Sequence, residues 1–479
     1  MGNYQKGFRR CGQILSNICG NLRVFICVVA VGLGVIIGLI LKTFDDLLEV
    51  EKLYITFPVH MLMGMVKVVT TPIVASGVII AICTFRSPPS KKIGFQAAVY
   101  FVSTTLISVT IGLILGVFFE PGITEGVSEI EPEDEKVFLS FETIKTLTRN
   151  LFPENLIQSC VKYYVRVKRE VPVIDAVSGL PTNMTYMKEE GHYVQGVNIL
   201  SIITFAILCG LAFNEMKESS SLLVQMVCIN NELAVVLLNI IGSFLPLGLL
   251  IMAVVFVDDH YDSHLVLNLV KFIAMVATGL FVHGVIVLPL LYLVCAKSNP
   301  FTVIYGAFPA LWTAFRSSSS NAAKPVTLHC CKNENKIDHR ITNFMLPIAT
   351  ELNLNGTALY QALAAVFIAQ LNNIDLDFNL LFTIGATAAV SSFIAKGIPT
   401  SGALMSFLIL YAVGLPMTNA WILVAVEWKL DHFTTLVNVL GDCIGVALVN
   451  KLYQDELRTE DADQDSPRTE DDEATDVSV

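Results

Sequence analysis

The chain has 479 residues, of which 54% are hydrophobic and 15% are charged. Soluble globular proteins carry about 25% charged residues, so this composition excludes an ordinary soluble enzyme and indicates that most of the chain lies in a bilayer. The formal net charge of −11 comes mainly from residues 455–479, where acidic side chains greatly outnumber two arginines. A general nucleic-acid-binding surface, which would be basic, is therefore excluded.

The N-terminal residues 1–23 contain four basic side chains and no acidic one, and an apolar run long enough to cross a bilayer follows them. This pattern predicts a membrane anchor whose N-terminus lies in the cytoplasm. Further apolar runs bring the predicted number of transmembrane helices to eight. They cover residues 24–41, 57–85, 95–119, 194–213, 233–257, 265–296, 341–371 and 421–452.

Two polar segments are expected outside the membrane. The stretch 120–193 follows three predicted spans and contains a glycosylation sequon at Asn183, so we expect an extracellular loop with Asn183 glycosylated. The tail 454–479 is acidic and poor in apolar residues, which predicts disorder in the cytoplasm. Its end, Val477-Ser478-Val479, would fit a scaffold domain that binds an extended C-terminus.

Two apolar stretches are interrupted by polar tips. Residues 301–315 end at the polar run 316–321, and residues 378–394 resume as 403–415 only after the tip 395–402. Such a pattern predicts a re-entrant helical hairpin, because irregular backbone at membrane depth must be shielded by protein or line a wet cavity. Each hairpin precedes a span rich in polar residues, which predicts inverted repeats around a transporter's binding site.

The last span carries polar residues along one face of the expected helix. They are Glu427, Asp431, Thr435, Asn438 and Asp442. An acidic side chain inside a membrane helix costs about 2.5–3.5 kcal/mol, so a cation, a substrate amine or a basic partner must compensate for these carboxylates. The alternative is an interior stripe of salt bridges with His432 or Lys429.

The preceding span has polar residues at alternate positions from Glu351 to Thr357. A continuous helix would spread them over both of its faces, whereas a break near Gly356 would let their oxygens converge. Hard cations prefer oxygen ligands of this kind. The alternative is a polar contact between helices, which asparagine and threonine commonly make.

Several motifs together resemble the sodium-coupled acidic and neutral amino-acid transporters, a family that includes the excitatory amino acid transporters and the alanine-serine-cysteine exchangers. The motifs are residues 317–320 (SSSS), 353–357 (NLNGT), 365–373 (AVFIAQLNN), 397–399 (GIP) and 438–442 (NVLGD). The resemblance implies a homotrimer in the plasma membrane. It also implies that residues 24–300 contribute mainly scaffold helices, with the third and sixth spans joining a core transport domain at 301–453 that moves as an elevator.

The resemblance also implies roles for individual residues. Asp431 would bind the substrate ammonium, and Asn438 would bind the carboxylate or amine region of the substrate. The remaining substrate-binding residues would come from the two hairpin tips and the side-chain pocket. They are Ser318, Ser319, Ser320, Ile398, Pro399, Thr400, Ser401, Gly402, Thr357, Thr434 and Thr435.

Sodium would be the coupling ion, and no other cofactor is expected. A first sodium site would consist of Ala349, Asn353, Asn438 and Asp442. A second site, which the change to Glu351 puts in doubt, would be formed by Glu351, Ser392 and Ala395. A third site would be formed by Phe101, Thr104, Thr105 and Asn355.

The substrate preference depends on one departure from the family pattern. Acidic-substrate members carry an arginine three residues after the ammonium-binding aspartate, and this chain has Thr434 there. Without that guanidinium, a substrate side-chain carboxylate would lie unpaired in a buried pocket. The sequence therefore favours a small neutral amino acid. The alternative is an acidic substrate such as glutamate or aspartate, with Arg316 supplying the guanidinium.

Other departures concern the coupling ions. Asn355 replaces a sodium-binding aspartate and Phe101 replaces a tyrosine, so we expect the third sodium site to be degraded. Lys324 and Lys396 add positive charge to the hairpins. One hypothesis is that Glu351 pairs with Lys396 or Arg316, so that an internal cation replaces an external one; the alternative is that these side chains extend to an aqueous cavity.

Two further function classes follow from the same departures: a substrate-gated anion conductance and a transport-inactive partner subunit. An enzyme is not expected. His283 lies on an apolar helix without a metal-ligand partner at helical spacing, residues 317–320 have no base nearby in the sequence, and no phosphate-binding glycine loop occurs.

Overall fold

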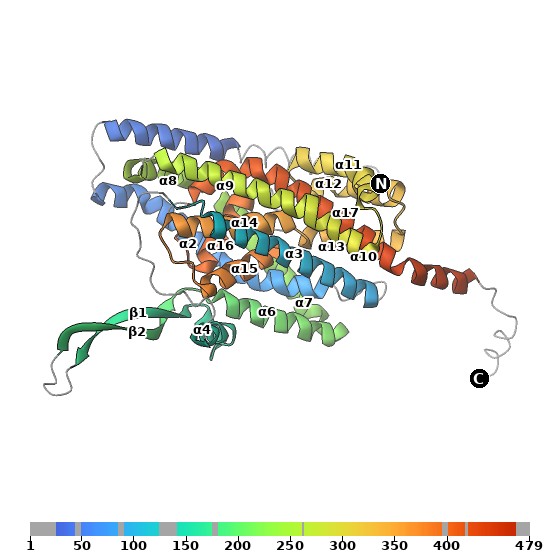
Figure 1. Cartoon of the computed structure of the whole chain (residues 1–479), viewed down its shortest axis with the longest axis horizontal. Helices are drawn as coiled ribbons and strands as arrows, with labels where there is room; N and C mark the ends of the chain where they lie inside the picture. The colour runs from blue at the N-terminus through green and yellow to red at the C-terminus, as the bar shows by residue number, and fades with distance from the viewer. Residues whose placement is uncertain are drawn as a thin grey trace.

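The computed structural model describes residues 25–43, 49–84, 91–123, 141–174, 181–260, 263–394, 401–416 and 420–465. Over these residues the chain is mostly helical, and the helices lie side by side in one elongated bundle (Figure 1). Seven helices in the described ranges are long and apolar enough to cross a bilayer, as expected for a multi-span membrane protein. They are Phe25–Thr43, Val50–Cys83, Lys92–Phe119, Ser221–Gly242, Val266–Ala296, His339–Leu371 and Lys429–Tyr453.

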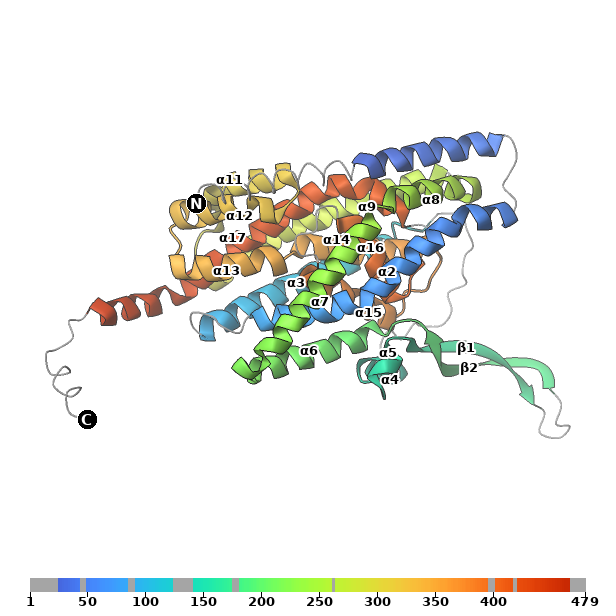
Figure 2. The ribbon, with the colours of Figure 1, turned by 180° about the vertical axis from the view of Figure 1, so that it is seen from behind.

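The first half of the chain also contains the helices α2 (Glu49–Cys83), α3 (Lys91–Phe119), α6 (Ile199–Glu215), α7 (Ser221–Gly242) and α8 (Leu245–His260). Helices α6, α7 and α8 pack against α2, whereas α3 packs mainly against the helix Asn355–Leu371. Helix α7 crosses α2, as Figure 2 shows. The predicted span at 194–213 is therefore present as the shorter helix α6.

At the predicted span 233–257, the structure has a longer helical segment. This segment consists of α7 and α8, which follow each other across a short turn, and the predicted span covers only the second half of α7 and most of α8. The predicted start of this span, at residue 233, was too late because Asn230, Asn231 and Glu232 interrupt the apolar pattern. In the structure Asn231 is buried and its Oδ1 accepts a 3.0 Å hydrogen bond from Ser76 Oγ on α2, so the helix continues through this polar segment.

The polar segment 120–193 is more structured than the predicted loop. It contains the short helices α4 (Phe141–Leu151) and α5 (Leu156–Ser159) and the strands β1 (Lys162–Ile174) and β2 (Pro181–Gln195). The two strands pair antiparallel, with Tyr164 opposite Tyr193, and project from the helical bundle (Figure 1). The all-α prediction thus holds for the membrane bundle only, and Asn183 lies on β2.

The remaining helices form the second half of the bundle. A sixth predicted span is made of α9 (Ser263–Phe281), the π-helical turn η3 (Val282–Val287) and α10 (Leu288–Ala296). Two helix pairs match the arms of the predicted hairpins. They are α11 (Pro300–Ser317) with α12 (Ser320–His329), and α15 (Phe378–Ile394) with α16 (Ser401–Val413). The members of each pair pack against each other.

The seventh predicted span is divided into α13 (His339–Leu352) and α14 (Asn355–Leu371). Asp338 caps α13, because its side chain accepts a 2.7 Å hydrogen bond from the Arg340 backbone N–H and lies 3.1 Å from the Arg340 guanidinium. Burial favours a higher pKa for Asp338, but the hydrogen bonds and charge of Arg340 outweigh it and hold that pKa below its ordinary value.

The last helix, α17 (Trp421–Asp465), runs along the bundle and extends beyond it (Figure 1). It therefore includes residues 454–465, which the sequence predicts to be disordered; residues 466–479 lie outside the described ranges. These residues include leucine, glutamate, arginine and alanine, which favour helix, and the first proline comes only at position 467.

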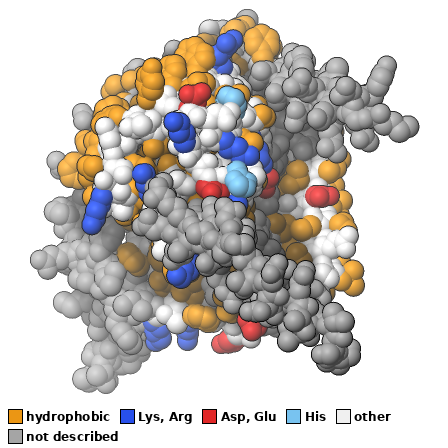
Figure 3. All heavy atoms as spheres, turned by 90° about the vertical axis from the view of Figure 1, so that its right-hand side faces the viewer, with side chains coloured by type: hydrophobic (Ala, Val, Ile, Leu, Met, Phe, Trp, Pro, Cys, Tyr) orange, Lys and Arg blue, Asp and Glu red, His pale blue; other side chains and the backbone are white. Residues whose placement is uncertain are grey.

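Burial differs sharply between the candidate spans. The most apolar part of His339–Leu371 is 94% buried, and that of Lys429–Tyr453 is 83% buried. The corresponding values are 28% for Phe25–Thr43 and 17% for Ser221–Gly242. The polar spans are thus enclosed by other helices, while exposed apolar side chains cover the flanks. Charged side chains gather at one end of the bundle, as Figure 3 shows.

Close packing of α3 against α17 gives the first prediction. A Cβ atom at Gly445 would overlap the ring of Tyr100, which is buried on α3. We expect Gly445→Val to lower the free energy of unfolding by about 1–3 kcal/mol, because the ring has no room to move. Thermal unfolding in detergent measures this effect. Gly64→Ala is the control, because a Cβ there meets nothing within 4 Å. Equal unfolding temperatures for the two variants would contradict the prediction.

Candidate functional site

The sequence predicted a helix break near Gly356. In the structure, the break between α13 and α14 lies at Asn353 and Leu354, three and two residues before that glycine. Asn353 has φ −97° and ψ 55°, and Leu354 has φ −90° and ψ 59°, so neither residue is helical. The first turn of α14 then approaches α17 so closely that a Cβ at Gly356 would lie 2.6 Å from the Thr434 carbonyl oxygen. Glycine is required at this contact.

Asn438 on α17 stabilises the start of α14. Its Oδ1 accepts a 2.7 Å hydrogen bond from the Gly356 backbone N–H, and its Nδ2 donates a 3.1 Å hydrogen bond to Thr357 Oγ1. The first N–H groups of a helix have no partner within that helix, so a side chain from a neighbouring helix must satisfy them. Asn438 therefore joins two of the predicted binding segments.

Asp442 lies at the centre of the first predicted sodium site. It is fully buried, and its Oδ1 accepts a 3.0 Å hydrogen bond from Asn353 Nδ2. Among the described residues, its other oxygen, Oδ2, has no hydrogen-bond partner. A buried carboxylate with a free oxygen is costly unless a cation or donor reaches it, so this position fits a cation ligand.

The residues predicted for the first sodium site come together at the helix break. Asn353 is held beside Asp442, and the Ala349 carbonyl lies one turn earlier, where it accepts a 2.8 Å hydrogen bond from the Asn353 N–H. Asn438 lies one turn before Asp442 on α17 and is buried. These groups supply carbonyl, amide and carboxylate oxygens, the ligand types that a hard cation such as sodium prefers.

Helix α3 provides a row of hydroxyl groups to the same region. Thr104 Oγ1 donates to Asn353 Oδ1 at 3.3 Å, and Thr105 Oγ1 donates to Asn355 Oδ1 at 2.9 Å. Two contacts were not predicted: Ser108 Oγ donates to the Asn355 carbonyl at 2.6 Å, and Tyr100 OH donates to the Gly441 carbonyl at 2.7 Å. The four-residue spacing of Tyr100, Thr104 and Ser108 along one helix face was a signal that could have identified them.

At the third predicted sodium site, the side chains of Thr105 and Asn355 bond directly to each other. Asn355 Oδ1 accepts from Thr105, and its Nδ2 is buried without a partner in the part of the chain that the structure describes. Phe101 is buried next to Tyr100 and supplies no oxygen. An amide donor in the place of a carboxylate oxygen disfavours a cation, and the loss of this site stays a prediction.

The predicted substrate-binding residues of α17 lie on the same helix face. Asp431 is half-buried, and its Oδ1 accepts a 3.3 Å hydrogen bond from Thr434 Oγ1. Thr434 and Thr435 are buried, and Thr357 lies opposite, bonded to Asn438. In its ionised form, the Asp431 carboxylate would suit a substrate ammonium.

The tip between α11 and α12 contacts α17 through a histidine. Ser318 adopts the left-handed conformation, with φ 47°, and Ser319 caps α12 by accepting a hydrogen bond from the Ala322 N–H. His432 Nδ1 lies 2.6 Å from both Ser318 Oγ and the Phe315 carbonyl oxygen. From the sequence, His432 was predicted only as a possible salt-bridge partner, whereas in the structure it contacts the serine-rich tip. Ser320, the first residue of α12, is buried beside this tip.

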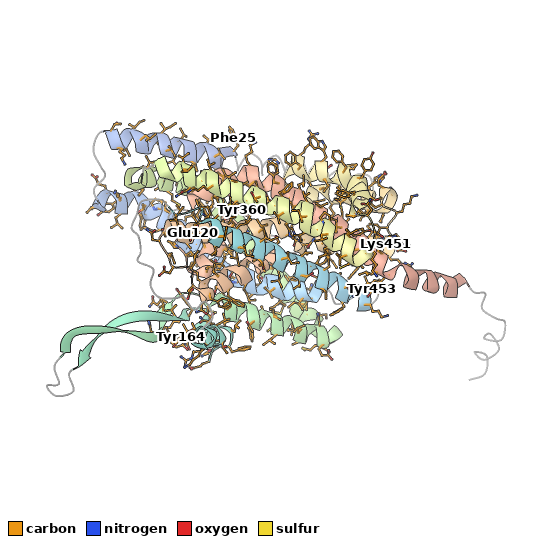
Figure 4. All side chains as sticks on the ribbon, in the orientation of Figure 1. Phe25, Glu120, Tyr164, Tyr360, Lys451 and Tyr453 are labelled. Atoms are coloured by element: carbon orange, nitrogen blue, oxygen red, sulfur yellow. The ribbon has the colours of Figure 1, made fainter. Side chains whose placement is uncertain are left out.

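A second buried carboxylate lies nearer the start of α17. Glu427 Oε2 is buried without a hydrogen-bond partner among the described residues. The hydroxyl groups of Tyr360 on α14 and Ser406 on α16 are buried and lie close to each other. Tyr360 lies within electrostatic range of Glu427 and in the interior of the bundle (Figure 4). These oxygens are suited to an ordered water or a cation.

Part of the predicted site cannot be placed. Ala395, Lys396, Ile398, Pro399 and Thr400 lie outside the described residues, and only the backbone is described for Ser392, Ser401 and Gly402. Glu351 is half-buried in the last turn of α13, and Arg316 is exposed at the end of α11. The structure therefore leaves the predicted pairing of Glu351 with Lys396, and the second sodium site, as predictions.

A family model described as the sodium:dicarboxylate symporter family matches residues 23–452. The chain belongs to the sodium:dicarboxylate symporter family. Its similarity to excitatory amino acid transporter 3 of Mus musculus is 38% identity over 449 residues, covering 91% of this chain and 86% of the relative.

Two other relatives extend the comparison. Excitatory amino acid transporter 1 of Ambystoma tigrinum is 35% identical and covers 92% of the chain and 84% of its own length. Excitatory amino acid transporter 2 of Homo sapiens is 35% identical, with 95% and 82% covered. The resemblance to sodium-coupled amino-acid transporters, predicted from the motifs, is confirmed, and this member of the symporter family is a multi-pass membrane protein.

The contact between α14 and Asn438 gives the second prediction. Asn438→Leu keeps the size of the side chain but leaves the buried Gly356 N–H and Thr357 hydroxyl without their partner. Each lost partner costs about 1–3 kcal/mol, so we expect a lower unfolding temperature in detergent and loss of sodium-dependent uptake. Asn333→Leu is the control, because Asn333 is exposed and bonds only to His329. Normal uptake by Asn438→Leu would refute this account of the site.

Proposed function

We propose that this symporter carries an acidic amino acid across the plasma membrane together with sodium and catalyses no covalent reaction. The observation that supports it most is the similarity over more than nine-tenths of the chain to proteins named excitatory amino acid transporters. Asp431 would bind the substrate ammonium, and the N-terminus of α12, a helix that packs against α17, would suit a carboxylate through Ser319 and Ser320.

This proposal reverses the preference for a small neutral amino acid that Thr434 favoured. The comparisons favour the acidic alternative, because the relatives are named for excitatory amino acids. The neutral substrate remains the second candidate for one reason: Thr434 is buried and donates its hydroxyl to Asp431, so it provides no positive charge for a second substrate carboxylate. The basic residue nearest to Thr434 in the sequence of α17 is His432, and the basic residue nearest to the serine-rich tip is Arg316.

Sodium fits the site formed by Asp442, Asn353, Asn438 and the Ala349 carbonyl. Asp442 supplies the negative charge and its free Oδ2, and the helix break positions Asn353 beside it. When bound, sodium would neutralise the buried carboxylate, and the same Asn438 that lies next to it contacts the substrate pocket through Thr357. Binding of ion and substrate is therefore coupled through one side chain.

We also propose the family's assembly and motion for this chain: a homotrimer with inverted repeats, two re-entrant hairpins and an elevator-like transport domain, with both termini in the cytoplasm and Asn183 glycosylated outside. Support comes from the contrast in burial. The two polar spans are enclosed by protein, whereas Phe25–Thr43 and Ser221–Gly242 expose most of their apolar surface to lipid or to other subunits.

Uptake by cells that express the protein tests the substrate. We expect saturable, sodium-dependent uptake of labelled aspartate and glutamate, with weaker uptake of labelled serine and alanine. We further expect Thr434→Arg to lower the half-saturating concentration for aspartate, because a guanidinium would pair with its side-chain carboxylate. Cells without the protein and sodium replaced by choline are the controls.

Each other outcome of this experiment favours a different function. Neutral uptake without aspartate uptake would restore the neutral substrate. Substrate-gated current without net uptake would favour an anion conductance. No uptake alone, but assembly with another member of the family, would favour a transport-inactive partner subunit.

The number of coupled sodium ions gives a further prediction. Asn355 and Phe101 remove an anionic ligand and a hydroxyl from the third predicted site. We expect the double variant Asn355→Asp with Phe101→Tyr to show a steeper dependence of uptake on sodium concentration than the unaltered protein. Asn372→Asp, at the end of α14, is the control for an added charge on the same helix. Equal steepness in all three proteins would show that these residues do not set the sodium number.

A further inference from the structure

Lys324 lies in the second turn of α12, in the first hairpin. Its neighbour Ala323 is fully buried, and Lys324 itself is half-buried. Helix α12 packs against both α13 and α17, the helices that carry Asn353 and Asp442. In the described residues, no hydrogen bond or ion pair holds the Lys324 ammonium.

The positive charge of Lys324 acts on Asp442. The Lys324 ammonium lies within electrostatic range of the Asp442 carboxylate, although the two do not form a direct ion pair in the structure. The free Oδ2 of Asp442 is the atom that lacks a partner. Attraction between opposite charges is strong where water is excluded, so this lysine contributes to the electrostatic balance of a fully buried carboxylate.

The side chains around Asp442 add no further negative charge for a cation to neutralise. The side chains that contact it or share its site, Asn353 and Asn438, are neutral, and Asn355 is neutral where an additional carboxylate was expected. A sodium ion and the Lys324 ammonium would therefore serve the same single carboxylate. Two cations close to one anion repel each other, so the presence of one weakens the binding of the other.

We propose that Lys324 is a tethered cation that competes with sodium for the Asp442 carboxylate and thereby lowers the sodium affinity of this transporter. The lysine stem is flexible, and its ammonium can extend to Asp442 when sodium is absent or toward water when sodium is bound. In the sodium-free protein, Asp442 then retains a counter-charge. The inference rests on the sodium coupling in the proposed function, but not on the identity of the substrate.

Sodium binding to the purified protein tests this role without any substrate. The unfolding temperature in detergent is measured as the sodium concentration rises, with choline keeping the ionic strength constant, since a ligand that binds the folded state stabilises it. We expect Lys324→Met to lower the half-saturating sodium concentration by about tenfold, because the competing charge is gone. Lys324→Arg keeps the charge and should remain within about twofold of the unaltered protein.

Lys332→Met is the matched control. Lys332 lies in η4 (Cys330–Glu334), in the same hairpin, and donates a hydrogen bond to Asn343 at the surface, so its loss should leave the sodium dependence unchanged. If Lys324→Met does not fold, Lys324→Gln replaces it with a polar side chain and carries the same expectation. Adding Asp442→Asn should abolish the difference between lysine and methionine at position 324, because the shared carboxylate is then absent.

The outcomes separate this inference from the proposed function. Sodium stabilisation of the unaltered protein, with the same half-saturating concentration in Lys324→Met or Lys324→Gln, would overturn the role of Lys324 alone. An equal decrease in Lys332→Met would also overturn it, because the effect would then be one of general charge. No stabilisation of the unaltered protein by sodium would overturn both the inference and the sodium site at Asp442.

Discussion

A fully buried carboxylate, Asp442, imposes the main constraint on this structure. One of its oxygens is held by Asn353, and the other has no partner among the described residues. An uncompensated charge in such a position would cost more than most single contacts contribute, so the surrounding helices must create a place for a positive charge. The break at Asn353 and Leu354 contributes to that place, since the side-chain amide of Asn353 lies against Asp442 of α17.

The break itself depends on α17. Asn438 satisfies the Gly356 N–H in the first turn of α14 and the hydroxyl of Thr357, and the absence of a side chain at Gly356 lets the two helices approach. Hydroxyl groups of α3 complete the arrangement by binding Asn353 and Asn355. Three helices that are distant in sequence thus hold one irregular segment, and the ion site and the substrate site share Asn438 as a common element.

Much of this organisation was predictable from the sequence, because intramembrane polar residues are rare and their spacing is informative. The polar face of α17 from Asp431 to Asp442, the helical arms α11, α12, α15 and α16 and the divided seventh span are present in the structure, while the re-entrant character of the two hairpins stays a prediction. The missed features depended on tertiary partners. Asn231 is compatible with a helix only because Ser76 bonds to it, and His432 is important only because Ser318 lies opposite. The strands β1 and β2 pair with each other outside the bundle, where hydropathy gives no signal. The comparisons favour an acidic substrate over the neutral one that Thr434 indicated, which a single residue of the pocket could not decide.

The nearly complete enclosure of α13 and α14 separates their polar residues from the bilayer. In the part of the chain that the structure describes, 94% of the most apolar part of His339–Leu371 is buried by protein, so these two helices have little contact with lipid. A change in bilayer thickness would therefore press on the outer helices first and reach the polar residues of α13 and α14 only through them.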